Sequence, residues 1–133
     1  MPSISFYQEP QAASPFRAGA LVIATLTSPR EKFWGAILHL GPEGISLRGV
    51  DLASFENLAT QIKSGEPFTA GVVFFPMHRV ERMELDLPEG NLLSLAQRFA
   101  EKTGQDPVPL LVSEFLGSPS AKPGGEPRGD KSR

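Results

Sequence analysis

The sequence predicts a small, mainly β domain with peripheral helices, in which five strands form a bent barrel. Three observations support this fold class. Runs of apolar and β-branched residues recur between turns rich in Gly and Pro, a pattern typical of short strands. The apolar spacing changes to three or four residues in two stretches, which predicts one inserted helix and one C-terminal helix. The length of 133 residues suits a single domain with its own core.

The first three predicted strands form a meander along the chain. They cover residues 19–27, 32–40 and 44–50. Both faces of the second strand are mostly apolar, so we expect this strand to be covered on both sides or strongly bent. Gly35 lies within it and suits a bend, because a residue without a side chain lets a strand curl.

Two helices are predicted, at residues 51–64 and 91–103, and a shorter helical segment at 109–116. Each of the two longer stretches places its apolar residues on one helical face: Leu52, Phe55, Leu58, Ala59 and Ile62, then Leu92, Leu95, Ala96 and Phe99. Both begin with polar residues that suit a helix cap: Asp51 or Ser54 in the first, and Ser94 with Gln97, or Asn91, in the second.

The last two predicted strands, residues 70–76 and 80–87, are joined by a corner of three residues. Pro76 ends the first of them. Val80 is out of phase with the apolar residues that follow it in the second strand, which predicts a β-bulge near its start.

Composition divides the chain into three parts. We predict an extended N-terminal segment over residues 1–17, in which residues 3–7 suit a short edge strand. A single barrel domain follows over residues 18–116, and a disordered tail rich in Gly, Pro and charge over residues 117–133. Residues 1–116 contain nine Lys and Arg against thirteen Asp and Glu, so this part of the chain is mildly acidic and does not favour non-specific nucleic-acid binding.

Several kinds of chemistry are excluded or disfavoured by residue content. The chain has no cysteine, which excludes disulfides, thiol nucleophiles and Cys-based metal sites. His39 and His78 are its two histidines, and neither lies in a metal-ligand motif, so we expect no metal and no cofactor. No secretory signal is visible, and the longest apolar run, residues 19–26, is too short to span a membrane. We therefore expect a cytoplasmic protein without membrane contact.

The order of these elements resembles the Sm-like barrel, a member of the SH3-like group, over residues 18–87. The three meandering strands lie where the first Sm motif places its strands, and Gly35 matches the mid-strand glycine of that motif. Residues 72–85 lie where the second motif is found. This resemblance implies a five-stranded barrel that assembles into rings and binds RNA. The chain also looks like small bacterial proteins that are functionally uncharacterised, a resemblance that implies no known activity.

The sequence departs from the Sm pattern where that family contacts RNA. In the loop between the second and third strands, Gly41 and Gly44 stand at the places comparable to the base-reading Asp and Asn of the family. The corner before the last strand lacks the Arg-Gly or Lys-His signature of the family. RNA binding is therefore an alternative function here, and its candidate residues are Arg30, Lys32, His78 and Arg79.

A second alternative is a small hydrolase or metal-dependent enzyme. It would require His78 to lie near a pair of carboxylates in a pocket. The carboxylates that follow His78 alternate with arginines, a pattern more typical of a salt-bridged, solvated strand: Glu81, Glu84, Asp86 and Glu89, with Arg79 and Arg82. No serine lies in a nucleophile-elbow motif, so the sequence does not predict an enzyme.

The function that the sequence favours is a non-catalytic interaction module whose partner is another protein or a second copy of the chain. A five-stranded open barrel leaves edge strands, which can pair with other chains. The candidate edge is an apolar run that ends at a proline: Val72, Val73, Phe74 and Phe75.

Overall fold

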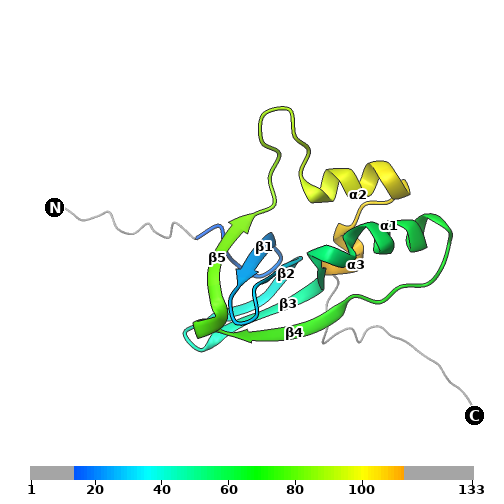
Figure 1. Ribbon diagram of the computed structural model, residues 1–133. Coiled ribbons are helices and arrows are strands. Elements are labelled where there is room, and N and C mark those ends of the chain that lie inside the picture. The colour runs from blue at the N-terminus through cyan, green and yellow to red at the C-terminus, as the bar shows by residue number, and fades with distance from the viewer. Residues whose placement is uncertain (1–13, 113–133) are drawn as a thin grey trace, which may run out of the picture.

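A computed structural model describes residues 14–112 of the chain, and they form a small fold dominated by antiparallel strands (Figure 1). The predicted extended segment and the predicted tail lie mostly or wholly outside the described residues. The five strands are β1 (Leu21–Leu26), β2 (Glu31–Gly41), β3 (Gly44–Asp51), β4 (Gly71–Pro76) and β5 (Val80–Leu85). The predicted fold class, mainly β with peripheral helices, is confirmed.

Three α-helices accompany the sheet: α1 (Phe55–Lys63), α2 (Leu95–Thr103) and α3 (Val108–Val112). A 3-10 turn, η2 (Leu52–Ser54), precedes α1 and takes up the start of the stretch predicted as one helix. Asp51 caps this turn, because its side chain accepts a hydrogen bond from the Ala53 amide, whereas Ser54 makes no side-chain cap at α1.

The predicted start of the second helix, at residue 91, is wrong by four residues. Helix α2 begins at Leu95, where Ser94 and Gln97 form the capping box that their spacing predicts. The preceding residues belong to a narrow loop instead, closed by a bridge between Glu89 and Leu92. Gly104 ends the helix in the left-handed conformation, with φ of 75°.

The sheet has the strand order β4-β3-β2-β1-β5, so β4 and β5 are its two edges although they are consecutive in the chain. The three-residue turn η3 (Met77–Arg79) joins these two edges. The Met77 amide donates to the Glu43 carbonyl, next to one end of β2, at 2.8 Å. The Arg79 carbonyl accepts from the Thr27 amide, near the other end of β2, also at 2.8 Å. If β2, with its 11 residues, were straight, its two ends would lie more than about 30 Å apart, too far for a three-residue turn to contact both. The sheet is therefore rolled.

The roll is made possible by a pair of glycines on its inner face. Gly35 of β2 lies directly opposite Gly49 of β3. A Cβ on either residue would overlap the backbone of the opposite strand, at the carbonyl of Arg48 or of Trp34. The predicted bend at Gly35 is thus matched by a second glycine across the ladder, and a register shift after Ile37 adds to it.

The strands have an apolar core on each face. The inner core fills the rolled sheet and contains Val22, Ala24, Leu26, Phe33, Ile37, Ile45, Leu47 and Phe75. The outer core lies between the sheet and the helices and contains Trp34, Ala36, Phe55, Leu58, Ala59, Ile62, Ala70, Phe99 and Leu111. Strand β2 contributes alternate residues to both cores, which confirms that it is bent and covered on both sides. Helices α1 and α2 lie on the same side of the sheet (Figure 1).

The bulge predicted near Val80 is present. Opposite Thr25 and Leu26 of β1 stand Arg82 and Val80, so one residue of β5 is left without a direct partner. This shift brings Val80 as well as Met83 and Leu85 against the inner core.

Candidate functional site

The turn η3 holds Arg79, one of the candidate RNA-binding residues, in a network of internal hydrogen bonds. Its Nε donates to the carbonyl of Thr27 at 2.9 Å, and its Nη2 donates to the carbonyl of Pro29 and to Glu31 Oε2, both at 2.8 Å. The guanidinium also lies 5.5 Å from the centroid of the Phe75 ring. Arg79 therefore fastens the turn between β1 and β2 to the corner between the two edge strands.

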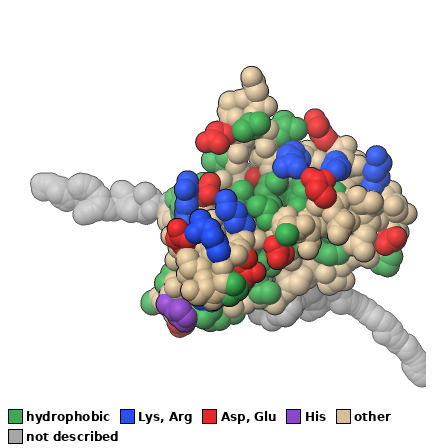
Figure 2. All heavy atoms as spheres, in the orientation of Figure 1, with side chains coloured by type: hydrophobic (Ala, Val, Ile, Leu, Met, Phe, Trp, Pro, Cys, Tyr) green, Lys and Arg blue, Asp and Glu red, His purple; other side chains and the backbone are tan. Residues whose placement is uncertain are grey.

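The other three candidate RNA-binding residues lie at the surface near this corner. Arg30 Nη1 contacts Glu81 Oε1 at 3.1 Å, while Lys32 and His78 are exposed. On the face shown in Figure 2, Lys and Arg side chains lie in two groups, and Asp or Glu side chains lie beside each group. The structure thus brings Arg30 and Arg79 to one end of the sheet, each with an acidic partner.

The carboxylates of β5 face solvent in ion pairs of the kind that their alternation with arginine predicts. Arg82 Nε lies 3.3 Å from Glu84 Oε2, and Glu81 pairs with Arg30. Within residues 14–112, no group of three or more His, Asp or Glu side chains is placed to hold a metal ion. His78 lies in η3 and is exposed.

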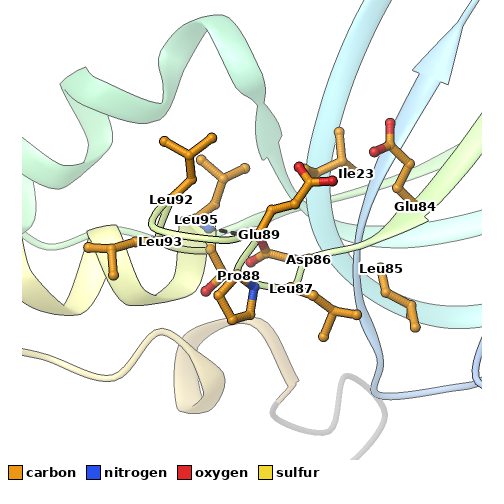
Figure 3. A pocket seen from close by; sticks show the side chains of 11 residues that line it. Ile23, Glu84, Leu85, Asp86, Leu87, Pro88, Glu89, Leu92, Leu93 and Leu95 are labelled. Atoms are coloured by element: carbon orange, nitrogen blue, oxygen red, sulfur yellow. Dashed lines mark hydrogen bonds between the residues drawn. The ribbon is translucent and has the colours of Figure 1, made fainter.

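Asp86 has a different role from the one predicted, because it is not part of a solvated strand face. It follows the end of β5, and its carboxylate accepts hydrogen bonds from three donors. These are the indole Nε1 of Trp34 at 3.0 Å and the amides of Leu95 and Ala96 at 2.8 and 2.9 Å. Figure 3 shows Asp86 beside Leu95. A carboxylate at a helix N-terminus also interacts favourably with the helix dipole. Asp86 therefore joins the sheet to α2 through the outer core.

Next to Asp86 lies a hollow of about 360 Å³ under the loop between β5 and α2. This loop extends away from the sheet and the helices (Figure 1). Leucines surround the hollow, and two of them are strongly exposed, Leu87 at 65% and Leu92 at 70% (Figure 3). Sequence reasoning missed this surface, because Leu92 was assigned to the buried face of a helix that in fact begins three residues later.

Strand β4 is the candidate edge, and it forms one side of the sheet. It pairs with β3, and no strand within residues 14–112 pairs with its other side. Val73 and Phe75 face the inner core, whereas Val72 and Phe74 project from the opposite face and are 41% and 53% exposed. The strand therefore presents two large apolar side chains to solvent beside an unpaired backbone.

The backbone groups on this unpaired side can be assigned from the ladder. The Met77 amide donates to the Glu43 carbonyl, and residues alternate in the side to which their N–H and C=O groups point. Phe75 and Val73 therefore bond to β3, whereas Phe74 and Val72 direct their N–H and C=O groups away from the sheet. Pro76 has no N–H to offer at the end of this row.

Comparisons of the chain with family models, with curated proteins and with solved structures found no match. Among the helices of residues 14–112, none is long and apolar enough to cross a membrane. The candidate surfaces are thus defined by the chain's own geometry: the corner around Arg79, the leucine-lined hollow, and the outer side of β4.

Proposed function

We propose that this chain is a non-catalytic interaction module that pairs a partner strand with the outer side of β4. The observation that carries the proposal is the exposure of Val72 and Phe74 beside backbone donors and acceptors that no strand of the described residues occupies. Backbone hydrogen bonds supply affinity in this kind of recognition, and side chains on the exposed face supply specificity. No residue of β4 is charged, so the strand itself places no charge against a partner strand.

We further propose that the rolled sheet is an Sm-like barrel. The strand order and the short corner between consecutive edge strands support this. The glycine pair Gly35 and Gly49, at the point of strongest bending, supports it as well. The proposal for β4 depends only on the edge and not on membership of that group.

A selection of strand-forming peptides tests the proposed function. A random peptide library would be selected against the dilute wild-type protein, and enriched peptides would then be measured against Val72→Pro and Glu84→Gln. Val72→Pro removes an outward N–H, whereas Glu84→Gln changes the opposite edge. We expect binding to be lost in the first variant and kept in the second. Peptides that bind Val72→Pro as well as wild type, or a selection without enrichment, would contradict the proposal.

RNA binding has less support as a function of this chain. Arg79 already donates hydrogen bonds to Thr27, Pro29 and Glu31. Arg30 forms an ion pair with Glu81. Phosphate contact by these residues would require those interactions to be exchanged. A purified sample with excess absorbance at 260 nm, removed by ribonuclease and dependent on Lys32 and His78, would reverse this preference.

A further inference from the structure

We infer that the partner of β4 is β4 of a second copy of this chain, paired antiparallel about a two-fold axis at Val73. This inference rests on the proposed function of β4 as a pairing edge. It adds the identity of the partner and the register of the pairing.

The two edges of the sheet differ in a way that favours this symmetric pairing. Strand β4 has the sequence GVVFFP without a charged residue, whereas β5 has the sequence VERMEL, with the ion pair between Arg82 and Glu84 on it. Charged side chains along an edge strand oppose pairing with another chain. Pairing of β4 with β5 of another copy would bury that ion pair, whereas pairing of β4 with itself joins two uncharged strands.

The register follows from the outward backbone groups. A two-fold axis at Val73 places Val72 opposite Phe74 of the second copy, and Phe74 opposite Val72 of the second copy. Each of these residues directs its N–H and C=O outward, so the two pairs exchange four backbone hydrogen bonds. An axis at Phe74 would instead set Val72 opposite Pro76, which has no N–H. An axis at Val72 would set Phe74 opposite Ala70, which precedes the strand.

The same register joins the exposed side chains. Val72 and Phe74 of one copy lie beside Phe74 and Val72 of the other on one face, and a β-branched residue beside an aromatic one is a favourable cross-strand pair. Arg48 of β3, opposite Val72, is the nearest cation along this row. Its counterpart in the second copy lies about 15 Å away across the joined sheets, beyond the screening length at physiological salt. Repulsion between the two copies of Arg48 therefore does not oppose the dimer.

Such an interface is small, so we expect a reversible dimer that forms as concentration rises. Sedimentation of the full chain between about 1 µM and about 1 mM measures this directly. We expect a transition from monomer to dimer in the wild type and in Glu84→Gln. We expect Phe74→Lys and Val72→Pro to remain monomeric, with circular dichroism spectra like that of the wild type.

Cysteine cross-linking tests the register, because the natural chain has no cysteine. In this register two copies of Val73→Cys face each other at a non-hydrogen-bonded position, with Cα atoms about 4.5 Å apart, a distance that suits a disulfide. Val72→Cys is diagonal to itself at about 7 to 8 Å, too far to bridge. We therefore expect Val73→Cys to cross-link, and Val72→Cys and Phe74→Cys to cross-link only when mixed with each other.

The outcomes separate the inference from the proposed function. A ring of several subunits, or cross-links between Val72→Cys and Glu84→Cys, would overturn the self-paired dimer and leave β4 as a pairing edge. A chain that stays monomeric without cross-links would also overturn the dimer, and the peptide selection would then decide whether β4 binds other strands. If the peptide selection also yields no peptide that binds β4, the proposed function is contradicted together with the dimer.

Discussion

Strands β4 and β5 are the two edges of one sheet, have six residues each and follow one another through a three-residue turn, yet they differ in chemistry. The outer face of β5 bears Arg82 and Glu84, whereas that of β4 bears Val72 and Phe74. An unpaired edge invites association, and charge is a common protection against it. One edge thus carries charges of the kind that oppose pairing and the other is apolar, which supports the proposal that β4 is the edge that pairs with a partner.

The largest effect is expected within β4 itself, where neighbouring residues differ in the direction of their N–H groups. Val73→Pro removes a hydrogen bond to β3, leaves a buried carbonyl without its donor and should cost about 3 kcal/mol in unfolding free energy. Val72→Pro removes only an outward N–H and should cost less than about 1 kcal/mol. Urea denaturation of both variants measures the difference. Equal losses would show that the assigned direction of these amides is incorrect.

The corner between the two edges should be nearly as sensitive. Arg79→Met removes the bonds to Thr27, Pro29 and Glu31 and should lower the unfolding free energy by about 2 kcal/mol. Arg82→Met, which breaks a solvent-exposed pair on β5, is the matched control and should cost less than about 0.5 kcal/mol. The two variants can be compared by thermal denaturation. A neutral Arg79→Met would mean that this residue is available for another role.

A variant of β5 can be made to resemble β4 in its apolar character. The double variant Arg82→Val with Glu84→Val removes two of the three charges of β5 and leaves Glu81, which is paired with Arg30. Both edges can then pair, and assemblies larger than a dimer should form. Exchanging the two residues, as Arg82→Glu with Glu84→Arg, keeps the ion pair and should leave the assembly unchanged. Light scattering after size-exclusion chromatography measures the mass. If the uncharged variant does not assemble further, charge is not what protects β5.

The smallest effect concerns a site remote from both edges. A hydrogen bond from Lys102 and the charges of Lys102 and Arg98 lower the pKa of Glu56, which outweighs the opposing effect of desolvation. A carboxyl with a lowered pKa stabilises the fold above its ordinary pKa, and this contribution is lost as the pH falls through the lowered value. In urea denaturation the wild type should thus be slightly more stable than Glu56→Gln at pH 7, and this advantage should shrink as the pH falls below the ordinary pKa of a glutamate.

The Glu56 variant also serves as a control for the comparison of edges. Glu56 links α1 to α2, so Glu56→Gln should leave the concentration dependence of the dimer unaltered. A change in dimer formation would indicate that the helices, and not β4 alone, take part in it.

The sequence predicted the strands well because their signals are local. Apolar faces on both sides of β2 predicted a strand that is covered on both sides or strongly bent, and the structure has a core on each face of it. The phase change at Val80 predicted the bulge. Gly35 pointed to a bend, but its partner Gly49 emerged only from the register between β2 and β3. Cross-strand neighbours depend on register, which the spacing along one strand does not determine.

The candidate site was predictable only in part. The exposed side of β4 was expected from its apolar run, and the structure places Val72 and Phe74 on it. The roles of Arg79 and Asp86 were not predicted, because each depends on a partner more than 45 residues away in the chain. The role of Asp86 also depends on the start of α2, which was predicted at the wrong residue. Long-range hydrogen bonds of this kind leave no periodic trace in a sequence.

The chain's single tryptophan gives this fold an internal optical reporter. Trp34 is fully buried, stacks edge-on against Phe55 at 5.2 Å and donates its indole N–H to Asp86. Its fluorescence therefore responds to separation of the helices from the sheet, while far-ultraviolet circular dichroism follows the backbone as a whole. Emission that reddens before the dichroism is lost would reveal a state in which the helices have detached from an intact sheet, without any label being added.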